Sequence, residues 1–193
     1  MVDYRLHADA KVRRRASAAE IAARRRERAA QRSEEEWYSF AKDVCYRQLA
    51  MMERSVAQLR TALHRQLVPD EIANSVIDMF CQADLVNDER FARMFVRSKF
   101  ATKTTSRRVL RRELAEKGVS AELVEQALAE ISDDSELEAA RDFAQRKVRS
   151  MRGIDEETIR RRLYGALGRR GFCAEHIRQA IYDAFAGEDG DAC

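Results

Sequence analysis

Apolar residues recur three or four positions apart along most of the chain, and a short polar break follows each run. This spacing is typical of helices that bury one face. In the first long run that face carries Trp37, Phe40, Ala41, Val44 and Cys45. The same pattern predicts nine helices, over residues 34–52, 56–66, 70–82, 88–101, 106–117, 121–131, 134–150, 155–170 and 174–186. The chain is therefore predicted to be all-α.

The nine helices form three copies of one unit. Five positions of the middle copy recur 53 residues later, where Leu110, Leu114, Gly118, Val119 and Leu128 become Leu163, Leu167, Gly171, Phe172 and Ile181. A weaker copy stands 51 residues earlier, with Leu59, Leu63, Val68, Ile72 and Ile77. Repetition at this period indicates stacked units that bury their faces on each other and share a thin core. We therefore expect three tandem three-helix repeats in an elongated, curved array, which favours partner binding over catalysis.

The repeats divide the chain into five segments. The units are expected over residues 34–83, 84–132 and 133–186. Residues 1–33 form a basic, Ala/Arg-rich extension that we interpret as disordered or as a frayed helix. Its two arginine triplets leave a transit peptide or a nuclear signal as the alternative. Residues 187–193 form an acidic tail.

Glycine marks the end of the second helix in two of the units. Gly118 and Gly171 each stand where a helix ends with a residue at positive φ, and the next residue packs back onto the helix. Leu67 occupies this place in the first unit, so we expect a differently built turn there. Helix N-caps are expected at the polar residues that precede apolar runs, namely Asp88, Ser120, Asp134 and Asp155.

Composition and cysteine spacing argue against a membrane-spanning protein and against a secreted one. No apolar run approaches the length of a membrane span, and the first residues do not resemble a secretory signal. Four cysteines lie far apart, which argues against a zinc site or a disulfide framework and fits a reducing cytoplasm. We therefore expect a cytoplasmic protein.

The sequence offers few candidates for catalytic or metal-binding residues. The sequence has no phosphate-binding glycine loop and no nucleophile elbow. His176 falls in an apolar position of the repeat, and Cys173 three residues earlier gives only two metal ligands. We therefore expect no catalytic residue, no metal and no cofactor, and no enzyme activity.

Charge is distributed unevenly although the net charge is only +3. Residues 1–32 carry a net +6, which leaves −3 for the remainder. Residues 90–112 nevertheless hold nine Lys or Arg and no acid, and residues 141–178 hold eleven against five acids. Basic stripes beside acidic patches suit a protein that meets both a protein surface and a phosphate backbone.

The candidate binding residues are the basic side chains of these stripes, because the arginine fork accepts two phosphate or carboxylate oxygens. For any one arginine a solubilising role is the better explanation, whereas nine basic residues in 23 without an acid favour a binding surface for the set. No exposed aromatic residues are expected between them, so stacking on single-stranded bases is not supported. The predicted contact residues are Arg90, Arg93, Arg97, Lys99, Arg107, Arg108, Arg111, Arg112, Arg160, Arg161, Arg162, Arg169 and Arg170.

Two neighbouring motifs carry a family resemblance. The first reads Asp88-Glu89-Arg90-Phe91-Ala92-Arg93, and the second reads Arg107-Arg108-Val109-Leu110-Arg111-Arg112-Glu113-Leu114-Ala115-Glu116-Lys117-Gly118. Together they resemble the central region of the RecX family, bacterial regulators of the RecA recombinase. The resemblance covers roughly residues 41–185. The first unit departs from the family pattern at Met52-Glu53-Arg54-Ser55 and at Gln66-Leu67-Val68.

The resemblance implies three tandem three-helix repeats that bind in the groove of a RecA–DNA filament. It implies inhibition of filament growth, of ATPase and strand-exchange activity, and of RecA-stimulated repressor cleavage. The expected partners are RecA and its nucleoprotein filament, with the DNA phosphate backbone as a further contact, and we expect a monomer. The second and third units are expected to hold most of the filament-facing charge. The first is expected to complete the core or contact another part of the partner.

The residues alone leave two alternative functions open. One is a DNA-binding protein of helix-turn-helix-like repeats that acts without RecA. The other is a helical adaptor for a different protein, as repeat arrays often are.

Overall fold

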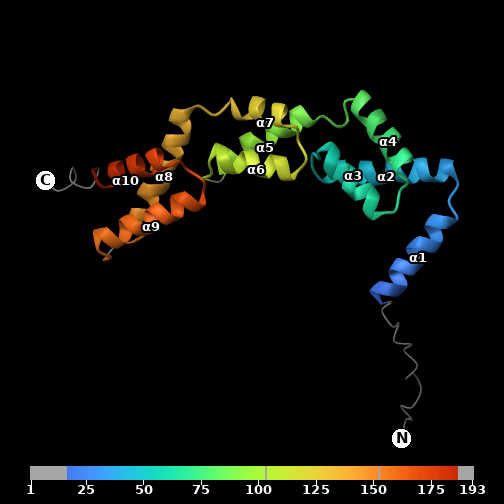
Figure 1. Ribbon diagram of the computed structural model, residues 1–193, viewed down its shortest axis with the longest axis horizontal. Coiled ribbons are helices and arrows are strands. Elements are labelled where there is room, and N and C mark those ends of the chain that lie inside the picture. The colour runs from blue at the N-terminus through green and yellow to red at the C-terminus, as the bar shows by residue number, and fades with distance from the viewer. Residues whose placement is uncertain (1–16, 103, 152, 187–193) are drawn as a thin grey trace, which may run out of the picture.

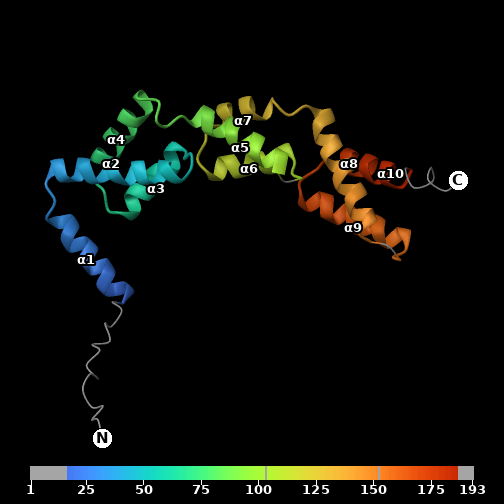
Figure 2. The ribbon, with the colours of Figure 1, turned by 180° about the vertical axis from the view of Figure 1, so that it is seen from behind.

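The computed structural model describes residues 17–102, 104–151 and 153–186, and these contain ten helices and no strand. The helices follow one another along an elongated arch (Figures 1 and 2). Helix α1 (Ala18–Ala30) precedes three units of three helices. The units comprise α2 (Glu34–Met51), α3 (Val56–Arg65) and α4 (Asp70–Gln82); α5 (Asp88–Thr102), α6 (Arg107–Glu116) and α7 (Ala121–Leu128); and α8 (Asp133–Arg149), α9 (Glu156–Arg169) and α10 (Ala174–Ala186).

The predicted fold class is confirmed: the chain is all-α, with three consecutive three-helix units in a curved array. Helix α1 lies within the expected extension and is capped by Ser17, whose hydroxyl accepts a hydrogen bond from the Glu20 N–H. The remainder of that extension, residues 1–16, and the acidic tail, residues 187–193, lie outside the described residues. None of the helices in the described ranges is both long and apolar enough to cross a bilayer.

Each unit has a hydrophobic core of its own, so the expectation of a core shared between units is wrong. The centre of each core is a pair of leucines, one turn apart on the second helix and without exposed surface. These pairs are Leu59 and Leu63, Leu110 and Leu114, and Leu163 and Leu167. Burying one such side chain stabilises the unit by roughly 1.5–3 kcal/mol. The units are therefore separately packed bodies, and the contacts between them have another chemistry.

The turn after the second helix is the same in all three units. Gly118 and Gly171 adopt φ of 77° and 85°, and Leu67 adopts φ of 64°. The next residue, Val68 in the first unit, donates its N–H to the carbonyl five residues back, at Leu63. The expectation of a different turn at Leu67 is therefore wrong, because the hydrogen bonds and the packing of Val68 impose the left-handed conformation on a residue with a side chain.

Two predicted N-caps are correct and two are wrong. Ser120 and Asp155 cap α7 and α9 through their side chains. Asp88 is instead the first residue of α5, where the Asn87 side chain accepts the Arg90 N–H. Asp134 lies in the first turn of α8, which is capped by Ser132. An earlier polar residue caps the helix in both cases, which leaves the Asp88 carboxylate available for a contact with another unit.

Replacing Leu67 by Gly is expected to stabilise the protein by about 0.5–1 kcal/mol. Glycine removes the steric cost of the left-handed conformation, about 1–2 kcal/mol, and loses part of this gain to its freedom in the unfolded chain. Leu67 is 44% exposed, so little buried area is lost. Urea unfolding measures the difference. Leu67→Ala is the control and should not stabilise, because it keeps Cβ. A destabilised Leu67→Gly would show that the turn depends on the leucine side chain.

Candidate partner-binding surface

The first and second units meet through polar contacts around the N-terminus of α3. The Asp88 carboxylate, at the start of α5, accepts a hydrogen bond from the Val56 N–H at 2.9 Å. The Ser55 hydroxyl donates to the Lys117 carbonyl at 2.6 Å. Arg90 reaches back to Glu53 at 3.3 Å. These contacts satisfy helix-terminal groups that have no partner within their own helices.

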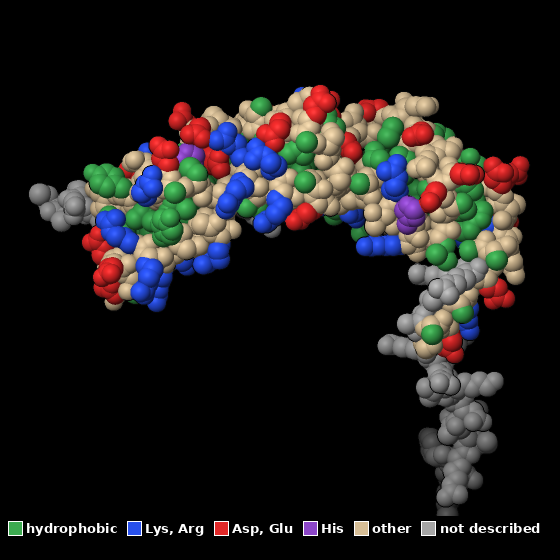
Figure 3. Space-filling model, viewed as in Figure 1, with side chains coloured by type: hydrophobic (Ala, Val, Ile, Leu, Met, Phe, Trp, Pro, Cys, Tyr) green, Lys and Arg blue, Asp and Glu red, His purple; other side chains and the backbone are tan. Residues whose placement is uncertain are grey.

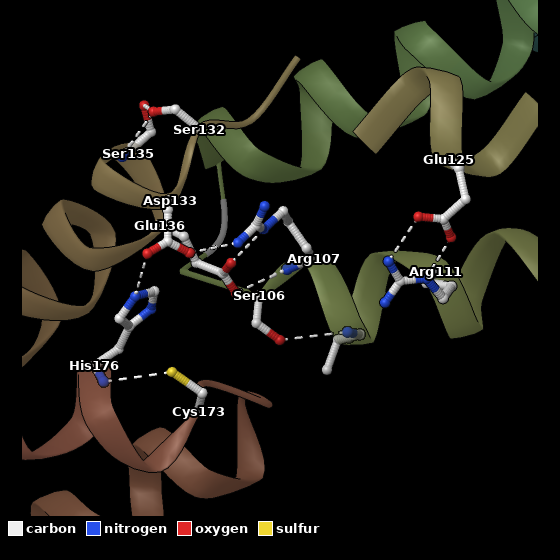
Figure 4. Close-up of polar contacts among 11 residues, drawn as sticks. Ser106, Arg107, Arg111, Glu125, Ser132, Asp133, Ser135, Glu136, Cys173 and His176 are labelled. Carbon is white, nitrogen blue, oxygen red and sulfur yellow. Dashed lines mark hydrogen bonds and ion pairs between the residues drawn. The ribbon is translucent and has the colours of Figure 1, made fainter. Parts of the chain in front are cut away.

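The junction between the second and third units has the same arrangement as the junction between the first and second. The Glu136 carboxylate accepts the Arg107 N–H, at 3.1 Å, and the Arg107 Nε–H, at 2.6 Å (Figure 4). The Ser106 N–H donates to the Arg170 carbonyl at 3.2 Å. Arg107 also pairs with Asp133, at 2.6 Å. At both junctions, therefore, a carboxylate of the following unit accepts the first N–H of α3 or α6.

Glycine allows the backbones to approach at these junctions. A Cβ on Gly118 would overlap Ala57 of the preceding unit, and a Cβ on Gly171 would overlap Ser106 and Val109. The two glycines thus serve both the turn and the packing between units. This explains why the first unit tolerates Leu67, since within the described residues only α1 precedes it and no three-helix unit packs against that turn.

His176 is buried, as the repeat pattern predicts, and its Nε2 lies 3.2 Å from Asp133 (Figure 4). Asp133, Glu136 and His176 come close enough to resemble a cation site. The Arg107 guanidinium, however, already contacts both carboxylates. A metal ion there would have to displace a paired guanidinium from Glu136, which is only 8% exposed. The cluster is therefore the charged part of the junction.

Ion pairs within the chain involve eight of the thirteen predicted contact residues. Arg93 and Arg97 both contact Glu130, and Lys99 contacts Glu113 at 2.9 Å. The paired residues are Arg90, Arg93, Arg97, Lys99, Arg107, Arg111, Arg112 and Arg160. The structure thus divides the predicted contact residues into paired and unpaired ones. A paired guanidinium gains less from a partner, because binding would first break its internal ion pair.

The other five predicted residues form no ion pair with a carboxylate of the described residues. Arg170 stacks over the Phe143 ring, with its guanidinium carbon 4.0 Å from the centroid. The remaining four are exposed on α6 and α9, and they are Arg108, Arg161, Arg162 and Arg169. Helices α3, α6 and α9 lie along the concave side of the arch in both ribbon views. Figure 3 shows Lys and Arg side chains gathered along this side. We call the side formed by α3, α6 and α9 the concave face.

Helix α9 also carries an exposed aromatic residue that was not expected from the sequence. Tyr164, one turn from Arg160 and Arg161 on α9, is 52% exposed. The expectation that no exposed aromatic residue interrupts the basic stripes is therefore wrong at this position. The helical spacing from Leu163 and Leu167, both buried, places Tyr164 on the open side of α9 and could have indicated this.

Two arginine–glutamate pairs, Arg97 with Glu130 and Arg111 with Glu125, are each joined by two hydrogen bonds. These bonds shift the pKa values of the groups that they join. Hydrogen bonds from Arg111 lower the pKa of the Glu125 carboxyl, and Arg97 does the same to Glu130. The pKa of each arginine is raised in turn by the carboxylate that it contacts. All four groups are therefore charged at neutral pH.

Comparison with known proteins identifies the family. Sequence models of the first, second and third three-helix domains of RecX match residues 41–79, 87–128 and 134–181, one in each unit. Together these matches cover more than half of the chain.

The chain belongs to the RecX family. It is 38% identical over 138 residues to the "Regulatory protein RecX" of Amycolatopsis mediterranei, covering 72% of this chain and 79% of that protein. The protein of the same name from Streptomyces coelicolor is 37% identical over 153 residues, covering 77% and 80%. The RecX crystal structure from Lactobacillus salivarius matches with a TM-score of 0.71 at 18% identity, covering 79% of this chain and 99% of that one.

Replacing Arg107 by Ala is expected to destabilise the protein by about 2 kcal/mol, because the buried Glu136 carboxylate loses its guanidinium partner and keeps only the backbone N–H of residue 107. Arg111→Ala is the matched control. It breaks a more exposed pair with Glu125 and should cost about 0.5 kcal/mol. Urea unfolding compares the two, and equal losses would contradict a structural role for Arg107.

Replacing Glu125 by Gln is expected to make stability less sensitive to acid. The folded pKa of Glu125 lies below its ordinary value of 4.5, so its pair stabilises the fold above that pH. This contribution is lost as the pH falls through the folded pKa. The variant should therefore show a smaller decrease in the free energy of unfolding between about pH 5 and pH 3. Urea titrations at several pH values measure it, with Glu122→Gln as control. A slope like that of the unchanged protein would contradict the pair's contribution.

Proposed function

We propose that this chain binds the RecA recombinase on its DNA filament and reduces filament growth, ATPase activity, strand exchange and RecA-stimulated repressor cleavage, without catalysing a reaction itself. The observation that carries the proposal is a set of four exposed arginines on α6 and α9, which have no carboxylate partner among the described residues. Membership of the RecX family, whose relatives carry the name regulatory protein, supports RecA as the partner. The setting would be DNA repair and the SOS response in the cytoplasm.

The architecture suits a partner that is itself a repeating assembly. Three separately packed units in line give a binding face much longer than one unit, so a single monomer can span neighbouring protomers of a filament. The fixed junctions keep these faces in register, which lowers the ordering cost of binding. Binding along the groove would then oppose both addition of protomers and movement of DNA within it.

The unpaired arginines are the contacts that we expect to matter most. Arg162 and Arg169 are seven residues apart on α9 and therefore face the same side. A phosphate oxygen or a carboxylate of RecA can meet either of them without first breaking an internal ion pair. The paired residues, such as Arg97 with Glu130, would lose that pair on binding and gain less.

Direct DNA binding without RecA is the second candidate. Tyr164 favours it, because an exposed aromatic ring beside Arg160 and Arg161 is a surface on which a base can stack. The net −3 of the chain after residue 32 counts against strong binding to duplex DNA.

The double variant Arg162→Gln, Arg169→Gln tests the proposal. Inhibition of RecA ATPase on single-stranded DNA by substoichiometric protein should need about five- to thirtyfold more variant, since two charge contacts of roughly 0.5–1 kcal/mol each are lost. The matched control is Arg47→Gln, Arg178→Gln, which removes the same charge from α2 and α10 and should inhibit normally.

Equal inhibition by the two double variants would contradict a role for the concave arginines. If the unchanged protein inhibits no RecA activity but binds single-stranded DNA alone, with a log affinity that falls linearly with log salt, the DNA-binding candidate replaces the proposal.

A further inference from the structure

A cleft of about 590 Å³ lies where the first and second units meet. Helix α3 forms one wall, and the end of α6 with Gly118 forms another. Its lining combines the basic residues Arg54, Arg65 and Lys117 with apolar Val44 and with several amide side chains. We call this space the first-junction cleft.

The positive charge of the first-junction cleft is unmatched within the described residues. Neither Arg54, Arg65 nor Lys117 forms an ion pair with a described carboxylate. The one acidic residue of the lining, Glu116, pairs with Arg112. The Nε–H of Arg54 is also buried without an acceptor among the described residues. Glu53, its neighbour in sequence, contacts Arg90 through Oε1, and its Oε2 is itself buried without a donor among the described residues. A buried guanidinium N–H without an acceptor is costly, so an incoming oxygen ligand would be strongly favoured.

The cleft at the second junction, about 480 Å³, provides an internal comparison. It too is lined by arginines, but Asp133 and Glu136 lie in the same lining and pair with Arg107. Arg111 in that lining pairs with Glu125. The chain therefore supplies its own carboxylates at the second junction and supplies none to the three cations of the first-junction cleft.

We propose that the first-junction cleft binds acidic side chains of a protein partner, with Arg54, Arg65 and Lys117 as the contacts. Where the partner is RecA, the assignment rests on the proposed function. The first unit then contributes to the binding face directly, whereas the sequence analysis expected that charge mainly in the second and third units.

The lining favours a protein segment over a nucleic-acid backbone. Val44, Ala57, Ala62 and Ala115 offer apolar contact beside the cations, which a peptide side chain can use and a phosphodiester cannot. Amide groups such as Gln48 both donate and accept hydrogen bonds, as a peptide backbone requires. Carboxylates of aspartate and glutamate match the arginine fork.

The first test does not involve RecA. A capped peptide of six glutamates is titrated into the full-length protein, and the Gly118 amide and arginine Nε–H signals are followed by nuclear magnetic resonance. We expect these signals to shift, and a capped peptide of six glutamines to leave them unchanged.

Arg65→Glu should weaken glutamate-peptide binding at least fivefold. Arg60→Glu, on the same helix but outside the lining, should have little effect. Unchanged Gly118 and Arg54 signals would overturn the proposal, as would a thymidine oligonucleotide that shifts them at lower concentration.

The second test uses RecA filaments on single-stranded DNA and the same pair of variants. Arg65→Glu should inhibit ATPase activity several-fold less well than Arg60→Glu. If both inhibit as well as the unchanged protein, RecA is not the source of the acidic segment. If the unchanged protein itself does not inhibit, the proposed function fails, while the peptide titration still decides whether the cleft binds carboxylates.

Discussion

The architecture depends on one contact made twice: a carboxylate of one unit accepts a hydrogen bond from the first N–H of the second helix of the unit before it. Asp88 makes this contact with Val56, and Glu136 makes it with Arg107. Because each unit has its own core, these polar contacts and the glycine approaches beside them align the array. The helix N-terminus supplies both an unpaired donor and a partial positive charge, so a carboxylate is the natural partner.

The same chemistry divides the arginines into two groups. Arg107 is held by Glu136 and Asp133 and belongs to the junction, although its position in the sequence resembles that of Arg108. Arg108, Arg162 and Arg169 have no such partner in the described part of the chain and remain exposed. A basic stripe in a repeat protein thus contains residues that fix the array and residues that can meet a partner. Some of the acids are four residues away on the same helix, as Glu116 is from Arg112, but those that hold Arg107 come from another helix.

Much of the fold could be predicted from sequence because it rests on local rules. Helical periodicity and the recurring leucine and glycine positions placed all nine helices of the three units close to their observed bounds, since these features act within a few residues of each other. The sequence could not show that Leu67 adopts the left-handed turn, because the packing of Val68 decides it. Nor could it show the pairing of Arg107 with Glu136, which lie 29 residues apart. The first-junction cleft was missed for the same reason, because Arg54 and Lys117 come from different units.

The central claim is that the aligned α3, α6 and α9 form one continuous binding face. Hydrogen–deuterium exchange of the protein, alone and on RecA filaments assembled on single-stranded DNA, tests it most directly. Added protection is expected along α3, α6 and α9, including the segment around Gly118, with little change in α4, α7 and α10. Protection confined to a single unit, or found mainly on α4, α7 and α10, would contradict it.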